Sequence, residues 1–280
     1  MATKSTMLEF KSIGTDTEVF LQTRAGKPVP VIGLIGGTKE KPRSVLGGKG
    51  YAIQEDNVMA EFNIPPAVTA RAFSASIDKI LARLTEEVGK HDLEIKIAAA
   101  CHFDPKQLEH PQAQHIGCEP DFCVWTRSIN EFDESKRDLL QTMRSSGGHV
   151  HVGFTDNGGA PTIDSQELVV MFLDLFLGVP SVVLDKDHDR RKLYGKAGAF
   201  RPKPYGVEYR VLSNFWIAHE SLREWVFNNT HKALLYANDP AYRRALLDRH
   251  EDIIQTINTQ NVRKVNDLVA QFGVTMPRQS

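Results

Sequence analysis

Four short segments of this 280-residue chain share one pattern, in which two polar side chains are separated by a single residue inside a strand-like run. In a β-strand, residues two apart project to the same face of the sheet. The four pairs, with apolar or neutral residues between and around them, are Asp16 and Glu18, Glu61 and Asn63, His149 and His151, and Glu208 and Arg210. The pattern therefore predicts strands with one polar face and one face against a helix-covered core.

If these strands are neighbours, their polar face gathers several carboxylates. Two like unit charges about 4 Å apart repel by roughly 4 kcal/mol at an effective dielectric near 20, which is a sizeable part of a domain's stability. A bound cation would relieve that repulsion. Oxygen ligands with one or two imidazoles and no cysteine favour Mg²⁺ or Mn²⁺, and Mg²⁺ commonly keeps open positions for water and phosphates.

Each pair taken alone has a simpler interpretation. A solvated strand face explains Asp16 and Glu18, packing explains His149 and His151, and a cross-strand ion pair explains Glu208 and Arg210. Four such pairs in one chain favour a metal and phosphate site, with a polar solvated sheet face as the alternative.

Hydrophobic periodicity predicts the remaining elements. Strands are expected at residues 10–22, 29–35, 57–63, 93–101, 122–126, 149–154 and 207–212. A long amphipathic helix is expected at 67–90, and residues from 219 onward favour helices. A buried helix is expected to begin at the N-cap Asp164, with Glu167 completing a capping box, and to run toward Pro180.

This order of elements predicts an α+β fold whose largely antiparallel sheet is backed by helices. We expect a catalytic domain over residues 1–217 and a helical C-terminal segment, residues 218–280, packed on the same domain.

The overall charge excludes a global field that would recruit nucleic acid or membrane, since 34 basic residues balance 35 acidic ones. The apolar stretch at 169–184 is interrupted by Asp174, Gly178 and Pro180, and the first residues lack the apolar core of a leader. We therefore expect a cytoplasmic protein without a membrane partner. Three cysteines and no CxxC spacing predict reduced thiols rather than a disulfide framework.

Two loops have the composition of phosphate-binding lids. Residues 186–205 are basic and contain glycines, and the best phosphate contacts there are Arg191 and Arg201, with Lys196 beside them. A solvated basic loop, or one that contacts nucleic acid, is the alternative. The Gly36–Gly50 loop fits a lid less well because it lacks the spacing of a P-loop. A turn at Cys118–Asp121 either lines an acceptor pocket or is structural.

The spaced motifs GGTK, QEDNVMAEFNIPPA, IGCEPDF, SSGGHVHVGF and YGKAGAFRPKPYGVEYRVLSN resemble the bacteriophage COOH-NH2 ligases, also called phage amidoligases. The order of the polar strands is similar to that in the glutamine synthetase and γ-glutamylcysteine ligase superfamily. The likeness spans roughly residues 10–216 and implies a glutamine-synthetase-like sheet with a concave catalytic face.

The resemblance implies two groups of metal ligands. One ion would be held by Glu18 and Glu61 with Glu55 as a third ligand, and the second by Asp16, His149 and Glu208. The alternative for Glu55 is that residues 54–56 form only a turn. Many relatives carry Glu where Asp16 stands, so a water between its shorter side chain and the metal is the alternative to direct coordination.

The resemblance also implies catalytic and nucleotide-binding groups. Arg210 matches an arginine that neutralises the transferring phosphoryl group, and His151 matches a histidine near the phosphates or the substrate carboxylate. Together with the metal ligand Glu208, these would be the catalytic residues. Arg201, Arg191 and Lys196 would contact ATP.

The implied reaction uses ATP and Mg²⁺ (or Mn²⁺) to join a small-molecule or peptide carboxylate to an amine through an acyl phosphate. Two alternatives stay open, a phosphotransferase of the same fold like the guanidino kinases and a non-catalytic structural or binding module of a phage. The leucine and aromatic content after Trp216 fits either a helical core or a homo-oligomer contact.

Overall fold

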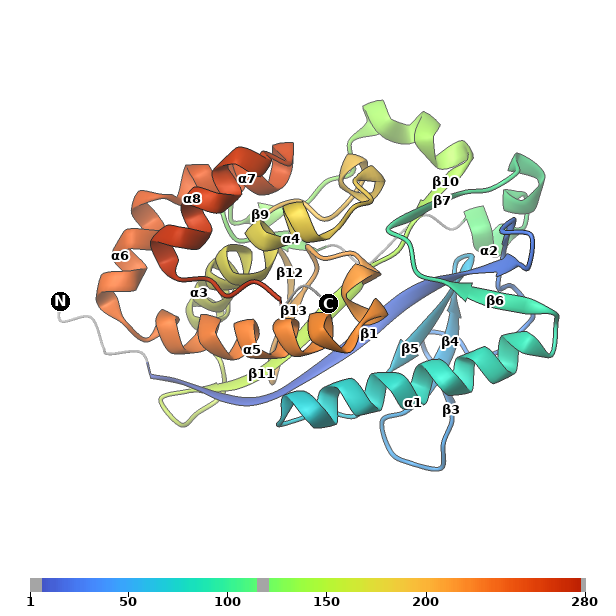
Figure 1. Ribbon diagram of the computed structural model, residues 1–280, viewed down its shortest axis with the longest axis horizontal. Helices are drawn as coiled ribbons and strands as arrows, with labels where there is room; N and C mark the ends of the chain where they lie inside the picture. Colours follow the sequence, from blue (N-terminus) through green and yellow to red (C-terminus); the bar gives the residue numbers. More distant parts are fainter. Residues whose placement is uncertain (1–6, 115–120, 278–280) are drawn as a thin grey trace.

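The computed structural model describes residues 7–114 and 121–277, and within them the chain forms an α+β fold (Figure 1). Eleven strands build one large antiparallel sheet, with the order β3-β4-β5-β1-β11-β13-β12-β8-β9, and β2 and β6 pair with the far end of β1. The predicted α+β class and antiparallel sheet are confirmed. The strands are β1 (Leu8–Thr23), β2 (Pro28–Val29), β3 (Arg43–Ser44), β4 (Ala52–Asp56), β5 (Met59–Asn63), β6 (Leu93–Lys96), β8 (Phe122–Cys123), β9 (Ser128–Ile129), β11 (Gly148–Asp156), β12 (Ala199–Lys203) and β13 (Gly206–Tyr209). The strands β7 (Ala100–His102) and β10 (Met143–Ser145) form a separate pair.

The long strand β1 organises the sheet, because it pairs with β11 along its first half and with β5 farther on. Its 16 residues alternate, so Ile13 and Val19 are fully buried on one face, while Asp16 and Glu18 lie on the other. In Figure 1 it crosses most of the molecule.

Helices cover the apolar face of this sheet. They are α1 (Ala70–Gly89), α3 (Ile163–Leu173), α4 (Val179–Leu184), α5 (Glu220–Ala237), α6 (Pro240–Asp248), α7 (His250–Thr259) and α8 (Val262–Phe272). The short helix α2 (Pro111–Gln114) lies elsewhere, where its Ala113 packs in a second cluster with Phe20 and Met59. The helix α5 packs against α1, α3 and β1, and it lies beside α1 in front of β1 in Figure 1.

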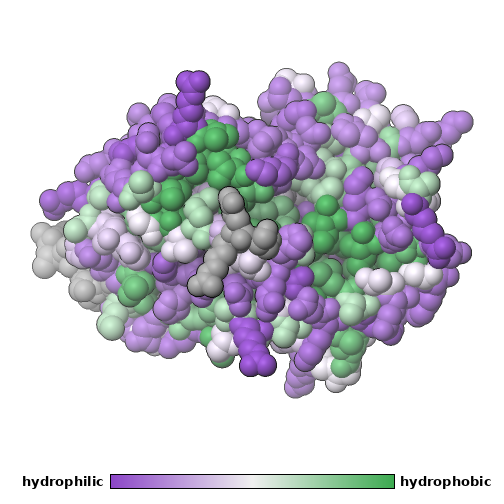
Figure 2. All heavy atoms as spheres, in the orientation of Figure 1, coloured by the Kyte–Doolittle hydropathy of each residue, from purple (hydrophilic) through white to green (hydrophobic). Residues whose placement is uncertain are grey.

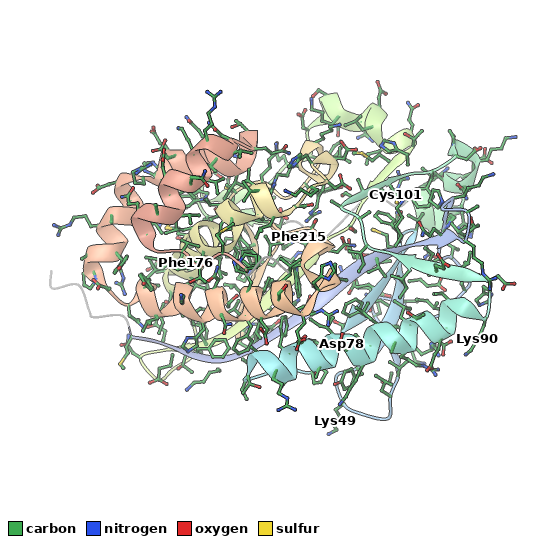
Figure 3. The ribbon with its side chains drawn as sticks, in the orientation of Figure 1. Lys49, Asp78, Lys90, Cys101, Phe176 and Phe215 are labelled. Atoms are coloured by element: carbon green, nitrogen blue, oxygen red, sulfur yellow. The ribbon has the colours of Figure 1, made fainter. Side chains whose placement is uncertain are left out.

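The helix α1 shows why these segments are helical. Its N-cap Thr69 accepts a hydrogen bond from the backbone N–H of Ala72. Its buried apolar residues recur at three- to four-residue spacing, at Phe73, Ile77, Ile80 and Leu84. On its other side, Asp78 accepts a hydrogen bond from Arg223 of α5 and ties the two helices together (Figure 3).

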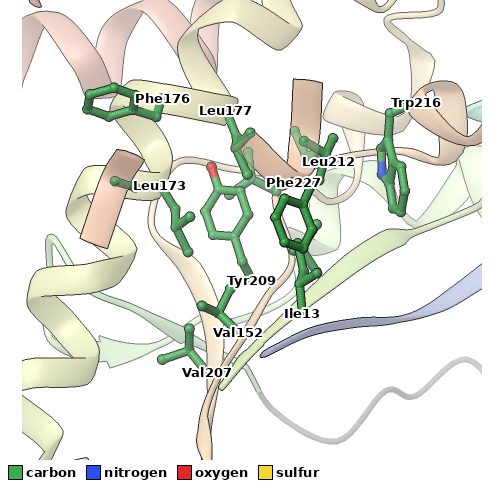
Figure 4. Packing of buried hydrophobic residues seen from close by; sticks show 14 of the residues in the cluster. Ile13, Val152, Leu173, Phe176, Leu177, Val207, Tyr209, Leu212, Trp216 and Phe227 are labelled. Carbon is green, nitrogen blue, oxygen red and sulfur yellow. The ribbon is translucent and has the colours of Figure 1, made fainter. Parts of the chain in front are cut away.

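The core lies between the sheet and the helices. Residues that the pattern places between the polar pairs are all buried there, with Val152, Val207 and Tyr209 fully buried (Figure 4). Trp216 packs against Phe73 and donates a hydrogen bond from its indole N–H to the carbonyl of Gly148, 3.1 Å away. A side chain of the core, Trp216, therefore holds Gly148, the first residue of β11, in place.

Several predicted boundaries differ from the structure, among them those of the helix α3 and of the expected strand 29–35. The helix α3 has its N-cap at Thr162, whose hydroxyl accepts from Ser165 N–H while the Ser165 hydroxyl accepts from Thr162 N–H, so Ser165 and not Glu167 completes the capping box. The expected strand 29–35 is paired only at Pro28–Val29, because the chain turns at Val31–Leu34.

Of the strands that were not predicted, two build the polar face. β4 lies where a turn at residues 54–56 was the alternative, and β12 lies in the segment expected to be a loop. Both are short strands next to predicted ones, and each adds a row of side chains to the polar face.

Within residues 7–114 and 121–277, one helical run, Ile163–Leu184, is long and apolar enough to cross a membrane by length and composition, but 72% of its apolar 18-residue window is buried inside the protein. It is the central helix of the core, made of α3, the π-helical turn Asp174–Gly178 and α4. On the face in Figure 2 hydrophilic residues predominate, with smaller hydrophobic groups between them. The boundary between residues 217 and 218 stays a prediction.

Candidate functional site

The strand register brings the polar pairs onto one face of the sheet. Asp16 lies opposite both His149 and Asn63, and Glu18 lies opposite Glu61. On the next strands His151 pairs with Glu208, which in turn pairs with Arg201. Because directly opposed residues of an antiparallel ladder share a face, these side chains form one polar surface.

The first group on this surface is the histidine cluster, defined as Asp16, His151 and Glu208. Their ligand atoms lie within 4.8 Å of one another. Asp16 Oδ1 is 3.0 Å from Nε2 of His151. Burial by itself raises the pKa of Asp16, but the two imidazoles beside it, those of His151 and His149, outweigh burial and hold that pKa well below its ordinary value.

Glu208 is fully buried and is the acid around which the cations gather. Burial and Asp16 raise its pKa, and Arg210 and the histidines outweigh them, so the pKa falls to about 2. Its Oε1 accepts from Arg210 and lies 3.2 Å from Nη1 of Arg201, and its Oε2 lies 2.7 Å from Nζ of Lys203. Glu208 is therefore ionised at neutral pH.

The second group is the carboxylate cluster, defined as Glu18, Asp56 and Glu61, whose oxygens also approach within 4.8 Å of one another. Burial raises the pKa of Glu18 to about 8, with Asp56 adding to the rise, although the Gly147 N–H donates to Glu18 at 2.6 Å. Burial and the surrounding carboxylates also raise the pKa of Glu61 well above its ordinary value. All three pKa values are thus raised, mainly by burial, and that of Glu18 lies above neutral pH.

His149 lies beside the histidine cluster and also approaches both of its acids. Its Nδ1 is 3.1 Å from Asp16 Oδ1 and 3.8 Å from Glu208 Oε1, and Arg210 approaches it at 3.3 Å. Burial and Arg210 lower its pKa to about 4, so it is a neutral imidazole. The histidine cluster thus contains His151, which was expected near the phosphates. His149 was expected to share a metal ion with the same two acids, Asp16 and Glu208.

Glu55 does not reach the polar surface. It pairs with Ala60 in the ladder, whereas Gln54 pairs with Glu61, so strand alternation turns Glu55 to the opposite face. There its carboxylate accepts backbone N–H bonds from Gly33, Ile35 and Gly36 at 2.8–3.0 Å. The expected ligand position is occupied by the next residue, Asp56.

Of the expected nucleotide contacts, Arg201 reaches the surface and Arg191 does not. Arg191 donates to the Ser181 hydroxyl at 2.6 Å and lies near Asp185, on the helix side of the sheet. Lys196 is exposed and lies near Arg191 and Asp133 rather than near either cluster. The reason is that only residues from 199 onward join the sheet, so only those side chains alternate onto the polar face.

Three residues at this site were not predicted as site residues. Asp56 follows Gln54 at strand spacing, and Lys203 follows Arg201 in the same way, so each repeats the two-residue pattern in a strand that the sequence analysis missed. Tyr205 precedes β13, and its hydroxyl lies 2.5 Å from Nδ1 of His151. Nothing in the local sequence signals that contact.

The expected turn at Cys118–Asp121 falls largely outside the described residues, which include only Asp121. The Asp121 carboxylate accepts from Nε of Arg210 at 3.3 Å and from the Asn130 side chain at 3.0 Å. The loop Gly36–Gly50, the weaker lid candidate, carries Lys49 at its exposed tip, where the side chain points away from the molecule (Figure 3).

Two cavities lie near the surface of the described chain. The larger, about 650 Å³, is on the far side of the molecule between α3 and α6 and contains neither cluster. The smaller, about 370 Å³, is lined by Gly153 and Tyr205 and so adjoins His151 along β11. The candidate active site is therefore identified by its clustered acids and histidines and not by the size of a cavity.

A family described as phage phiEco32-like COOH.NH2 ligase-type 2 has a model that matches residues 142–266, a little under half of the chain. The matched segment includes β11, β12 and β13 with His149, His151, Glu208 and Arg210, and it runs on into α8. No curated protein matches the chain. The resemblance predicted from the motifs is confirmed: over residues 142–266 this protein is similar to the phage COOH-NH2 ligases, a family whose name indicates an enzyme that joins a carboxyl group to an amine.

Proposed function

We propose that the protein is an ATP- and Mg²⁺-dependent carboxylate-amine ligase that works through an acyl phosphate. The observation that carries the proposal is the asymmetry of the polar surface. The histidine cluster is surrounded by Arg201, Lys203 and Arg210, whereas the carboxylate cluster next to it, two residues along β1, is predominantly acidic. A triphosphate with its metal ions matches this division of charge.

The residues present fit divalent ions. Both clusters offer only oxygen and imidazole ligands, which suit Mg²⁺ or Mn²⁺. Burial raises the pKa of Glu18 to about 8 and that of Glu61 well above its ordinary value, and a bound cation would favour the ionised form of both. When bound, the two ions would neutralise the acids and the phosphate oxygens beside them.

The chain's own groups would orient the reactants. Arg201, Lys203 and Arg210 would hold the triphosphate so that the substrate carboxylate attacks the γ-phosphorus and ADP leaves. The amine then attacks the carbonyl carbon of the acyl phosphate, phosphate leaves, and an amide remains. Neither step needs a covalent protein nucleophile. We place this reaction in the cytoplasm of a host cell, with the enzyme encoded by a phage.

A hydroxamate assay tests the proposal. The protein is incubated with ATP, Mg²⁺, hydroxylamine and a panel of carboxylic acids, and we expect one acid to give a hydroxamate and an equal amount of free phosphate. Glu208→Gln should abolish the product while leaving the thermal unfolding transition in place.

The outcomes separate the alternatives. A stable phosphorylated product without free phosphate would indicate a phosphotransferase like the guanidino kinases. No binding of Mg-ATP by calorimetry would indicate a non-catalytic module and would refute the proposed function.

A further inference from the structure

Asp174 is a buried carboxylate that lies on the helix side of the sheet, away from the polar surface. It is fully buried at the start of the π-helical turn Asp174–Gly178. Its Oδ1 accepts from the Tyr209 hydroxyl at 2.7 Å and its Oδ2 accepts from the Trp125 indole N–H at 2.6 Å. A buried carboxyl group with two side-chain donors, one on each oxygen, joins the segments that carry those donors.

The first donor belongs to the strand that carries the reactive groups. Tyr209 lies between Glu208 and Arg210 on β13, and alternation sends its side chain to the opposite face. Figure 4 shows its hydroxyl pointing toward the helix that carries Leu173, Phe176 and Leu177. Gly178 leaves room for it, since a Cβ there would lie 2.7 Å from the Tyr209 oxygen.

The second donor belongs to the segment that carries a partner of Arg210. Trp125 is four residues after Asp121, and between them β8 pairs with β12. Gly198 has φ +77° and no Cβ, and a Cβ would lie 2.6 Å from the Trp125 ring. The backbone N–H of Gly198 donates to Asp174 as well.

Both connections end at the same guanidinium. Tyr209 is adjacent to Arg210 in the chain, and Trp125 belongs to the segment whose Asp121 accepts from Arg210 Nε. We propose that Asp174 is a positioning residue that fixes Asp121 relative to Arg210, so that the guanidinium is aimed at the transferring phosphoryl group. This inference rests on the proposed ligase function.

The carboxylate is needed because every group around it donates. An asparagine at position 174 has one acceptor oxygen. If that oxygen accepts from the Trp125 N–H, the NH2 group faces Tyr209 and forces its hydroxyl to accept instead of donate. Trp125→Phe removes the indole donor and leaves Asp174 in place. It breaks the connection to Asp121 alone.

A double-mutant cycle tests the connection. The single variants Asp121→Asn, Trp125→Phe and Asp174→Asn are compared with the doubles Asp121→Asn/Trp125→Phe and Asp121→Asn/Asp174→Asn. We expect each single change to lower kcat for hydroxamate formation about 10-fold and to weaken binding of a Mg²⁺-bound non-hydrolysable ATP analogue. Each double variant should lie within about twofold of Asp121→Asn alone, because both changes break one arrangement. Mn²⁺ affinity should change by less than about twofold in all of them.

Asn229→Ala is the matched control. Asn229 is equally buried and donates to the carbonyl of Phe176 in the same π-helical turn, but it has no path to Arg210. Asn229→Ala should lower Tm. In the double variant Asp121→Asn/Asn229→Ala, the factor by which kcat changes should be the product of the factors of the two single variants.

The outcomes are distinct. Multiplicative effects of Trp125→Phe and Asp121→Asn, or an unchanged kcat in Trp125→Phe, would overturn the inference even if Asp174→Asn does not fold. An inactive wild-type protein that binds no ATP analogue would instead refute the proposed function.

Discussion

Among single residues, the neighbours Glu55 and Asp56 show how the face of a strand decides the role of an acid. Glu55 binds three backbone N–H groups on one side of β4, and Asp56 joins the carboxylate cluster on the other. The same chemical group therefore stabilises a loop in one position and offers a metal ligand in the next.

The two neutralising substitutions should separate these roles. Asp56→Asn should weaken Mn²⁺ binding about 10-fold or more and leave Tm of the metal-free protein unchanged or raised, because it removes a repelling charge. Glu55→Gln should lower the free energy of unfolding by about 1–3 kcal/mol and leave Mn²⁺ affinity unaffected. Calorimetric titration and thermal unfolding measure both effects, and weaker Mn²⁺ binding in Glu55→Gln alone would contradict the assignment.

The pKa of Glu18 makes the stability of the metal-free protein depend on pH. Its folded pKa, about 8, lies above the ordinary 4.5, so near neutral pH the folded protein keeps a proton that the unfolded chain has lost. The stabilisation that Glu18 provides is present in full below its ordinary pKa of 4.5. It is lost as the pH rises through the folded pKa of about 8. The pKa of His149 is lowered to about 4, so this group makes stability rise with pH, but only below its ordinary pKa of 6.5.

Between pH 6.5 and about 8, we therefore expect Tm in EDTA to fall as pH rises. Mg²⁺ should restore Tm most strongly at the upper end, and its binding should release protons at pH 7. Thermal scans across this range, with and without Mg²⁺, measure the effect. A Tm in EDTA that rises through the range would contradict the raised pKa values of the carboxylate cluster.

At the scale of elements, β12 decides which basic residues reach the site. It pairs with β13, and residues 201 and 203 alternate onto the polar face, whereas Arg191 lies in the helix layer and Lys196 is exposed. A loop of similar composition would have made no such distinction.

Lysines inside and outside this strand should therefore behave differently. Lys203→Gln removes the cation 2.7 Å from Glu208 and should raise the KM for ATP about 10-fold, since it removes a phosphate contact. Lys192→Gln, which breaks only an exposed pair with Asp189, should leave the KM unchanged. Steady-state kinetics with varied ATP distinguish the two, and equal effects would argue against β12 as the phosphate-binding element.

For the whole molecule, the site depends on how closely the core approaches β11. A Cβ at Gly148 would lie 2.3 Å from the Ser213 carbonyl and 2.6 Å from the Trp216 indole nitrogen. Gly148 is thus the point where the chain after β13 packs on the strand that carries both histidines.

Gly148→Ala should consequently destabilise the fold by about 1–3 kcal/mol and lower activity with it, because backbone rather than a flexible side chain has to move. Gly159→Ala, where the nearest atom to a new Cβ is at 3.5 Å, is the control and should be close to neutral. Denaturant unfolding compares the two. Equal stabilities would show that the contact at Gly148 relaxes without cost.

Local sequence determined which side chains lie on the polar face and which on the apolar face of each strand, because alternation along a strand needs no tertiary information. From it came the α+β class, the shared polar face of Asp16, Glu18, His151 and Glu208, and the apolar residues between them. Helix α1 was predicted in the same way, from apolar residues that recur at helical spacing.

Tertiary structure decided which of these groups meet. Pairing of the short strands β4 and β12 turned Asp56 and Lys203 toward the site and Glu55 away from it. For β12 this pairing includes β8, which is distant in the chain. Only packing of the central helix on the sheet brought Asp174 between Trp125 and Tyr209, which lie 84 residues apart in the sequence. No local pattern encodes a contact that forms when separate layers of the fold come together.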